Sequence, residues 1–147
     1  MTLIDAYSLP SAPVLLYQLL AERSTEDDPY VNISHRVLPS PAEHMAFFMS
    51  RPYVSWDMIE HDGVFIGYVS ATDRNELGIV LFKDWQERGL GTEALRLFMQ
   101  THDPLLAVPG KRSGRWLANI HPQNERSQHL FCKLGFRLIQ QTYAYEP

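Results

Sequence analysis

The sequence predicts an α+β fold in which an antiparallel meander of strands leads into a glycine-rich loop and then a helix. Two strand patterns, at 52–60 and 64–72, flank an Asp-Gly turn of the kind that closes hairpins. A third run, 76–82, is apolar and β-branched like a buried strand. After residue 89 the apolar residues recur at helical spacing. These three strands and the helix form the predicted centre of the fold.

Length and composition restrict the class of protein. The chain has 147 residues, of which 45% are hydrophobic and 20% charged, so we expect one globular domain over residues 1–147. A net charge of -4 argues against general nucleic-acid binding. A single cysteine, Cys132, excludes an internal disulfide and fits a reducing compartment. Without a signal pattern or an apolar run of roughly 18 residues, we expect a cytoplasmic protein with no membrane partner.

The N-terminal part predicts a short edge strand within 1–8 and two helices. Ser11 can cap the first helix, which ends near residue 23. The second helix has a strong start, because Ser40 can cap it and Glu43 can reach back as the capping-box partner. It runs to about residue 50.

The C-terminal part predicts two more strands and a further helix, about four helices in all. Residues 103–114 are rich in proline and glycine and should form a long connection. A fifth strand then covers 115–120, a helix covers 124–134, and a last strand runs through residue 143.

The loop between the third strand and its helix is the first chemical motif. Gly89 and Gly91 can adopt backbone angles closed to other residues and leave amide N–H groups bare at a helix N-terminus, where phosphate binds. The first inference is a ligand that carries a diphosphate. Gly89, Gly91 and Ala94 fit the dinucleotide fingerprint G-x-G-x-x-A, but the required βαβ unit and downstream acidic residue are missing.

The alternative pattern is Q-x-x-G-x-G, from Gln86 to Gly91, which resembles the coenzyme A diphosphate loop of the GNAT superfamily of N-acyltransferases. A second motif supports this resemblance. Residues 124–136, NERSQHLFCKLGF, are similar to the GNAT signature N-x-x-[AS]-x-x-x-[YF]-x-K-x-G-F and follow the first loop in the right order. Residues 75–78 and 91–95 look most like the branch that contains ribosomal-protein N-terminal acetyltransferases.

The resemblance implies the acyl-CoA N-acyltransferase fold, a mixed, mostly antiparallel sheet splayed between its fourth and fifth strands, with acetyl-CoA in the splay. It implies that the backbone of the third strand and Asn124 bind the pantetheine arm. The glycine loop would bind the diphosphate. The cofactor residues it implies are Ile79, Val80, Leu81, Gln86, Glu87, Arg88, Gly89, Leu90, Gly91, Thr92, Asn124 and Phe131.

The implied reaction is direct transfer of an acetyl group to an amine in a ternary complex. The acceptor stays open between a protein N-terminus, a small amine such as a polyamine, and a nucleotide-linked amino sugar. A homodimer is a further expectation.

Two catalytic roles need a residue, an acid for the leaving thiolate and a base for the amine. Phe131 stands where many members carry a tyrosine that protonates the leaving thiolate, so water, Ser127 or another residue would have to serve. This departure keeps a second hypothesis open, an acyl-CoA sensor without turnover. For the base that deprotonates the amine, Glu76 is the leading candidate and His121 the second. Asn119 stands where some relatives carry a catalytic glutamate and cannot act as a base.

Other chemical patterns are weak. The histidines lack metal-ligand spacing, so we expect no metal site. A basic cluster, Lys111, Arg112 and Arg115, suits a solvated loop better than a phosphate contact. Three polar residues between the first two helices fit either a substrate-facing segment or an ordinary polar surface, namely Asn32, His35 and Arg36.

Overall fold

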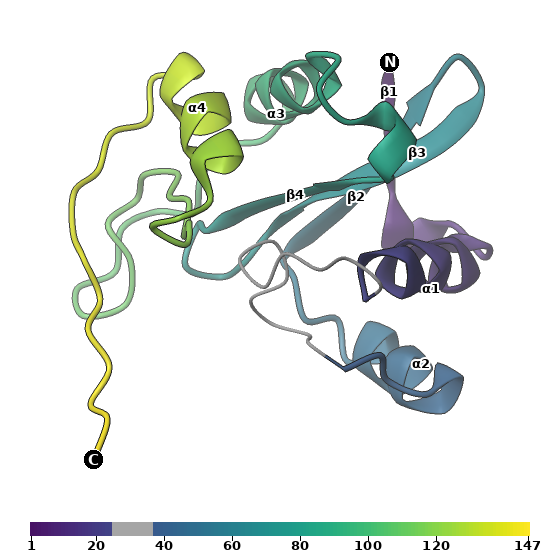
Figure 1. The fold of residues 1–147 in the computed structure, drawn as a ribbon, viewed down its shortest axis with the longest axis horizontal. Coiled ribbons are helices and arrows are strands. Elements are labelled where there is room, and N and C mark those ends of the chain that lie inside the picture. Colours follow the sequence, from purple (N-terminus) through teal and green to yellow (C-terminus); the bar gives the residue numbers. More distant parts are fainter. Residues whose placement is uncertain (25–36) are drawn as a thin grey trace.

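The computed structural model describes residues 1–24 and 37–147, which form a four-stranded antiparallel sheet with helices on both faces (Figure 1). The strand order is β1-β2-β3-β4. The strands are β1 (Thr2–Asp5), β2 (Ser55–His61), β3 (Val64–Ala71) and β4 (Leu77–Leu81). The α-helices are α1 (Ala12–Arg23), α2 (Pro41–Met49), α3 (Leu90–Thr101) and α4 (Glu125–Lys133). Two short 3-10 helices are η1 (Ala6–Ser8) and η2 (Lys83–Trp85).

The β2–β3 hairpin forms at the predicted Asp-Gly turn. Asp62 and Gly63 both have positive φ, 51° and 76°, as a tight hairpin turn with right-handed strand twist requires. The hairpin fixes the register of the sheet. Trp56 of β2 pairs with Ser70 of β3, and Ser70 in turn pairs with Gly78 of β4.

The two faces of the sheet carry separate cores. Helices α3 and α4 cover one face, whereas α1 and α2 lie on the other (Figure 1). The first core joins the sheet to α3 through Ile59, Ile66, Val69, Leu95 and Phe98. The second is smaller and aromatic, and joins α1 and α2 to Trp56 and Met58 of β2.

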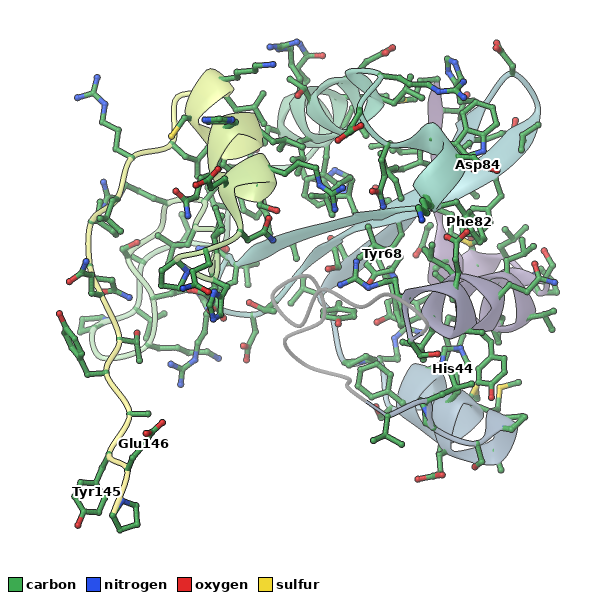
Figure 2. All side chains as sticks on the ribbon, viewed as in Figure 1. His44, Tyr68, Phe82, Asp84, Tyr145 and Glu146 are labelled. Carbon is green, nitrogen blue, oxygen red and sulfur yellow. The ribbon has the colours of Figure 1, made fainter. Side chains whose placement is uncertain are left out.

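The start of α2 has the predicted capping box. Ser40 Oγ accepts from the Glu43 amide at 3.1 Å, and Glu43 Oε1 accepts from the Ser40 amide at 3.0 Å. These hydrogen bonds lower the pKa of Glu43. His44 lies between the two helices, where Nε2 donates to the Pro13 carbonyl of α1 at 3.0 Å (Figure 2). The start of α1 differs from the expectation, because Ser11 precedes the helix but its side chain makes no capping bond.

A partly buried contact between a carboxylate and a histidine joins the sheet to α3. The carboxylate of Asp57 lies 3.3 Å from His102 Nε2, just past the end of the helix. Burial raises the pKa of Asp57, and the neighbouring His102 opposes that shift.

In place of the predicted fifth strand, the structure has a single β-bridge. Leu117 makes a parallel bridge with Glu76, in which the Leu77 amide donates to the Leu117 carbonyl at 2.8 Å. Within the described residues, 115–120 has no other backbone hydrogen bond to β4. The two segments therefore diverge beyond the start of β4. This keeps the expected splay but not the expected strand.

The prediction of a last strand through residue 143 was wrong. Residues 137–147 form no strand and run away from the body of the molecule (Figures 1 and 2). Leu138 is 81% exposed and Tyr145 is 89% exposed, so these apolar side chains have no face to pack on. A strand needs a paired neighbour as well as a suitable pattern, and no described segment supplies that pairing.

No helix in the described ranges 1–24 and 37–147 is long and apolar enough to cross a membrane.

Candidate active site

A cavity of about 700 Å³ lies where β4, the 86–92 loop and α4 meet, and it continues between the sheet and helices α1 and α2. It brings together most of the residues that the two motifs suggested. These are Glu76, Ile79, Val80, Leu81, Gln86, Glu87, Gly89, Gly91, Thr92, Asn124 and Phe131. Three predicted site residues do not line it, namely Arg88, Leu90 and His121.

The glycine loop leaves the N-terminus of α3 open. Gly89 precedes the helix in the left-handed conformation, with φ of 77°, and no side chain caps the first turn. The first helical hydrogen bond runs from the Glu93 amide to the Gly89 carbonyl at 3.1 Å. The amides of Leu90, Gly91 and Thr92 therefore lie outside the helical ladder and point past the helix end. Such amides, with the positive end of the helix dipole, form an anion site.

Gly91 has a different role from Gly89. A Cβ placed on Gly91 would lie 3.0 Å from Leu130 Cδ1 of α4 and 3.7 Å from Leu81 Cδ1 of β4. The absence of a side chain thus lets the first turn of α3 pack closely on α4. By contrast, a Cβ on Gly89 would meet nothing within 4 Å.

A hydrogen-bonded pair joins the loop to α4. Gln86 Nε2 donates to the Leu81 carbonyl at 3.0 Å, and Gln86 Oε1 accepts from Arg126 Nη1 at 2.7 Å. Arg126 lines the cavity and supplies a positive charge beside the anion site. The sequence analysis missed this residue, although it lies two positions after Asn124 inside the second motif. The signal was weak because Arg126 is on the exposed face of the helix, which apolar spacing does not report.

Asn124 caps α4 and also lines the cavity. Its Oδ1 accepts from the Ser127 amide at 3.2 Å. Within the described part of the chain its Nδ2 has no hydrogen-bond partner, so this donor is free for a ligand.

Glu76 is held at the start of β4 by two neighbours. Thr72 Oγ1 donates to Glu76 Oε1 at 3.1 Å, and Asn119 Nδ2 donates to Oε2. The Thr72 hydroxyl also accepts from the Glu76 amide at 3.2 Å. The carboxylate therefore has a fixed position on the cavity wall, at the point where β4 and the 115–120 segment separate. Neither Thr72 nor Asn119 was predicted to orient it.

The residue before Glu76 anchors this corner of the site. Asn75 is 1% exposed and adopts a left-handed φ of 62°. Its side-chain Nδ2 donates to the Leu105 carbonyl at 3.0 Å, and its Oδ1 accepts from the Leu105 backbone amide at 2.7 Å. Its backbone carbonyl accepts from the Leu117 amide at 2.9 Å. Asn75 thus joins the start of β4 to the two segments after α3 that contain Leu105 and Leu117.

Comparison with known families identifies the family of the chain. Residues 12–137 match the acetyltransferase (GNAT) domain family. The chain belongs to the GNAT acetyltransferase family. This makes acetyl-CoA the acyl donor and acetyl transfer the reaction. The dinucleotide interpretation is wrong, because β4 and α3 follow an antiparallel meander and not a βαβ unit.

Solved structures agree on the GNAT fold. The ribosomal-protein-alanine N-acetyltransferase from Brucella melitensis superposes with a TM-score of 0.68 at 18% identity, covering 93% of this chain and 85% of that one. A phosphinothricin acetyltransferase from Sinorhizobium meliloti, in complex with AcCoA, gives 0.66 at 22% identity over 95% and 76%. A putative acetyltransferase from Salmonella typhimurium with its cofactor acetyl-CoA gives 0.57 at 17% over 92% and 77%. A comparison with curated proteins found no match.

Two other residues considered for catalysis, Phe131 and His121, have surroundings that differ from those of Glu76. Phe131 is buried, stacks edge-on against Phe136 at 5.1 Å between ring centroids, and has no proton to donate. His121 follows the 115–120 segment, where its Nδ1 accepts from the Gln123 amide at 3.1 Å. Because His121 does not line the cavity, only Glu76 of the two base candidates faces it.

The remaining candidates have structural partners or cannot be placed. Lys111 pairs with Asp73 at 3.2 Å, and Arg112 donates to the Leu106 and Asp73 carbonyls at 2.7 Å and 3.1 Å. Neither residue lines the GNAT cavity, and Arg115 does not line it either. Asn32, His35 and Arg36 lie outside the described residues. In the described ranges, no group of three or more potential metal ligands occurs.

Proposed function

We propose that the amine attacks acetyl-CoA directly in a ternary complex, with Glu76 as general base. The observation that carries this proposal is the position of Glu76, whose carboxylate lines the same cavity as the open N-terminus of α3. A cofactor whose diphosphate binds at that N-terminus could extend its arm along β4 toward Glu76. Backbone groups of Ile79, Val80 and Leu81 would hold the arm, and Asn124 Nδ2 would donate to it.

The chemistry at the cavity needs one proton acceptor and one proton donor. The amine nitrogen forms a C–N bond with the thioester carbonyl carbon, and the C–S bond then breaks with its electron pair leaving on sulfur. A lysine-like amine has a pKa near 10.4, so a proton must leave it before or during attack at neutral pH. Glu76 takes that proton directly or through water. The thiolate is protonated by water or Ser127, since Phe131 cannot do so.

The experiment that tests this proposal is a panel of amines with acetyl-CoA, followed by detection of free thiol. The panel contains a peptide with a free N-terminus, a polyamine, an apolar amino acid amide and an amino-sugar nucleotide. Thiol release that depends on one of these amines supports the enzyme. Tight acetyl-CoA binding with neither transfer nor hydrolysis would instead support the sensor that Phe131 leaves open.

We also propose that residues 1–147 form one domain that works in the cytoplasm. The family match over 12–137 supports the first point, and the single exposed cysteine supports the second. Homodimerisation stays a prediction.

A further inference from the structure

The cavity has a second compartment beyond Glu76, on the face of the sheet that carries α1 and α2. We call it the acceptor chamber and define it by Phe47, Tyr53, Trp56, Tyr68 and Ser70, which all line the cavity. Tyr68 projects from β3 on the side of the sheet that faces α1 (Figure 2). The chamber therefore opens onto β4 from the face opposite α3 and α4.

The floor of the acceptor chamber is one row of the sheet. Strand register places Trp56, Ser70 and Gly78 side by side on β2, β3 and β4. A Cβ on Gly78 would lie 2.8 Å from Ser70 Oγ. The missing side chain at Gly78 thus leaves the Ser70 hydroxyl uncovered beside the strand that would carry the acyl arm. Because neighbouring strands lie about 4.8 Å apart, a group one strand away can bond to an atom adjacent to the attacking amine.

The chamber contains hydrogen-bonding groups that nothing in the described chain satisfies. Ser70 is only 4% exposed, yet its Oγ makes no hydrogen bond within residues 1–24 and 37–147. The Tyr68 hydroxyl also has no partner there, and burial raises its pKa, so the phenol stays protonated. Trp56 Nε1 is fully buried without a partner and can only donate. An unsatisfied buried donor such as Trp56 Nε1 costs about 1–3 kcal/mol. Ser70 and Tyr68 line the cavity, so their hydroxyls can donate to a ligand oxygen.

The aromatic rings form a wall and not a cation cage. Phe47, Tyr53 and Tyr68 pack edge-on against Trp56, with centroids 6.2, 4.9 and 5.6 Å from its ring. In a cage the ring faces converge on an empty centre, whereas these rings fill the centre with one another. Such a wall suits an apolar group.

The charges beside the chamber also disfavour a polycation. Arg23 lies close enough to Tyr68 to act on its ionisation. Of the three described carboxylates that line the cavity, Glu43 is committed to the capping box and Glu76 to Thr72 and Asn119, while Glu87 lies on the glycine loop. Among the described residues, a polyamine would therefore bring several positive charges beside an arginine, where two of the three lining carboxylates already accept hydrogen bonds.

We propose that the acceptor is a small α-amino carbonyl compound with a large apolar side chain, that is, an aromatic or branched aliphatic amino acid or its amide. Its amine faces Glu76, its carbonyl oxygen accepts from Ser70 and Tyr68, and its side chain packs on the aromatic wall. This assignment rests on the acetyl transfer proposed above, and it names one acceptor class for that reaction.

The test compares four acceptors. Phenylalanine, phenylalaninamide and 2-phenylethylamine share one apolar skeleton and differ in the carboxylate, amide or hydrogen on the α-carbon, and spermidine is the polycation without a ring or carbonyl. Wild type should acetylate the amide or the free acid with a kcat/KM at least about tenfold above 2-phenylethylamine, which lacks the oxygen. The ratio of amide to free acid distinguishes a neutral carbonyl from a carboxylate as the bound group. Preference for spermidine would overturn the assignment while leaving acetyl transfer intact.

Two variants test the acceptor chamber separately from the rest of the cavity. Ser70→Ala should lower kcat/KM for phenylalaninamide about tenfold but change 2-phenylethylamine less than about twofold, because only the first has an oxygen to lose. Tyr68→Phe should show the same selectivity. The matched control is Ser55→Ala, a β2 serine outside the cavity, which should behave as wild type. Equal losses with both amines would overturn the role of Ser70.

A binding measurement separates failure of the chamber from failure of catalysis. If no amine is acetylated, the proposed reaction is wrong. Calorimetric titration of phenylalaninamide into protein saturated with coenzyme A then tests binding in the acceptor chamber independently of catalysis. Binding that Ser70→Ala weakens and Ser55→Ala does not would support it, whereas no saturable binding would overturn it.

Discussion

Asn75 shows how one side chain can position a catalytic candidate without touching substrate. It is buried, adopts a left-handed backbone and bonds both ways to the backbone of Leu105. We predict that Asn75→Ala lowers the free energy of unfolding by about 3 kcal/mol. The substitution leaves the Leu105 backbone amide without its acceptor and places an alanine at a positive φ. Urea denaturation measures this. Asn75→Asp keeps the acceptor and tolerates the backbone, so it should lose less. A change below about 0.5 kcal/mol for alanine would contradict the anchoring role.

Arg126 should act on the cofactor through Gln86. We expect Arg126→Ala to weaken acetyl-CoA binding about fivefold to tenfold, about 1–1.4 kcal/mol, since it removes a charge and frees the Gln86 side chain. Calorimetry of Gln86→Ala, Arg126→Ala and the double variant gives the coupling between them. The exposed Arg96 of α3, outside the cavity, supplies the control Arg96→Ala. Strict additivity of the two single variants would show that the observed hydrogen bond carries no energy.

At the level of the element, the N-terminus of α3 depends on its two glycines for different reasons. Gly91→Val should push Leu130 and separate α3 from α4, so acetyl-CoA binding should weaken more than tenfold, over about 1.4 kcal/mol. Gly89→Ala enters open space but strains a positive φ, which should cost about 1 kcal/mol of stability with little loss of affinity. Thermal melting and calorimetry on both variants separate the two effects. Similar affinities for Gly91→Val and wild type would contradict the packing explanation.

Elements with local signals were predictable from the sequence. The Asp-Gly hairpin, the capping box of Ser40 and Glu43, and the glycine start of α3 all depend on residues within a few positions of one another, and the structure has all three. The fifth and last strands were not predictable in this way. A strand exists only when a distant backbone pairs with it, and here only Leu117 finds such a partner.

The same distinction between local and distant signals applies to the residues of the site. The cavity-lining residues of the glycine loop and α4 follow from the motif spacing, and their contact with the cofactor stays a prediction. The partners Thr72 and Asn119 of Glu76, and Arg126 of Gln86, come from other parts of the chain, so sequence periodicity alone could not pair them. The aromatic chamber was hidden for another reason. Trp56 has the pattern of an ordinary core residue, and only the tertiary structure shows that its neighbours border a cavity.

At the scale of the whole molecule, the C-terminal segment should be dispensable for the fold. The family match ends at residue 137, and the following residues are exposed and unpaired (Figure 1). We predict that ending the chain after Arg137 shifts the melting temperature by less than about 2 °C, because almost no buried surface is lost. Acetyl-CoA affinity should also stay unchanged. A loss of several degrees would show that these residues pack on the body of the protein in solution.

The central claim is that Glu76 accepts the amine proton, and one substitution tests it. In Glu76→Gln the side-chain oxygen can still accept from the Thr72 hydroxyl, and the new amide can donate to Asn119 Oδ1 once that side-chain amide turns over, so the shape is kept but proton acceptance is lost. The matched control is Glu60→Gln, an exposed glutamate on β2 away from the cavity.

The decisive measurement is kcat for both variants at saturating acetyl-CoA, with cofactor affinity measured in parallel. Our account predicts a fall of roughly 10²-fold for Glu76→Gln, larger for a lysine-like amine than for one of lower pKa, with acetyl-CoA affinity unchanged. Glu60→Gln should match wild type. If Glu76→Gln retained kcat within about twofold for both amines while binding acetyl-CoA normally, Glu76 would not be the base.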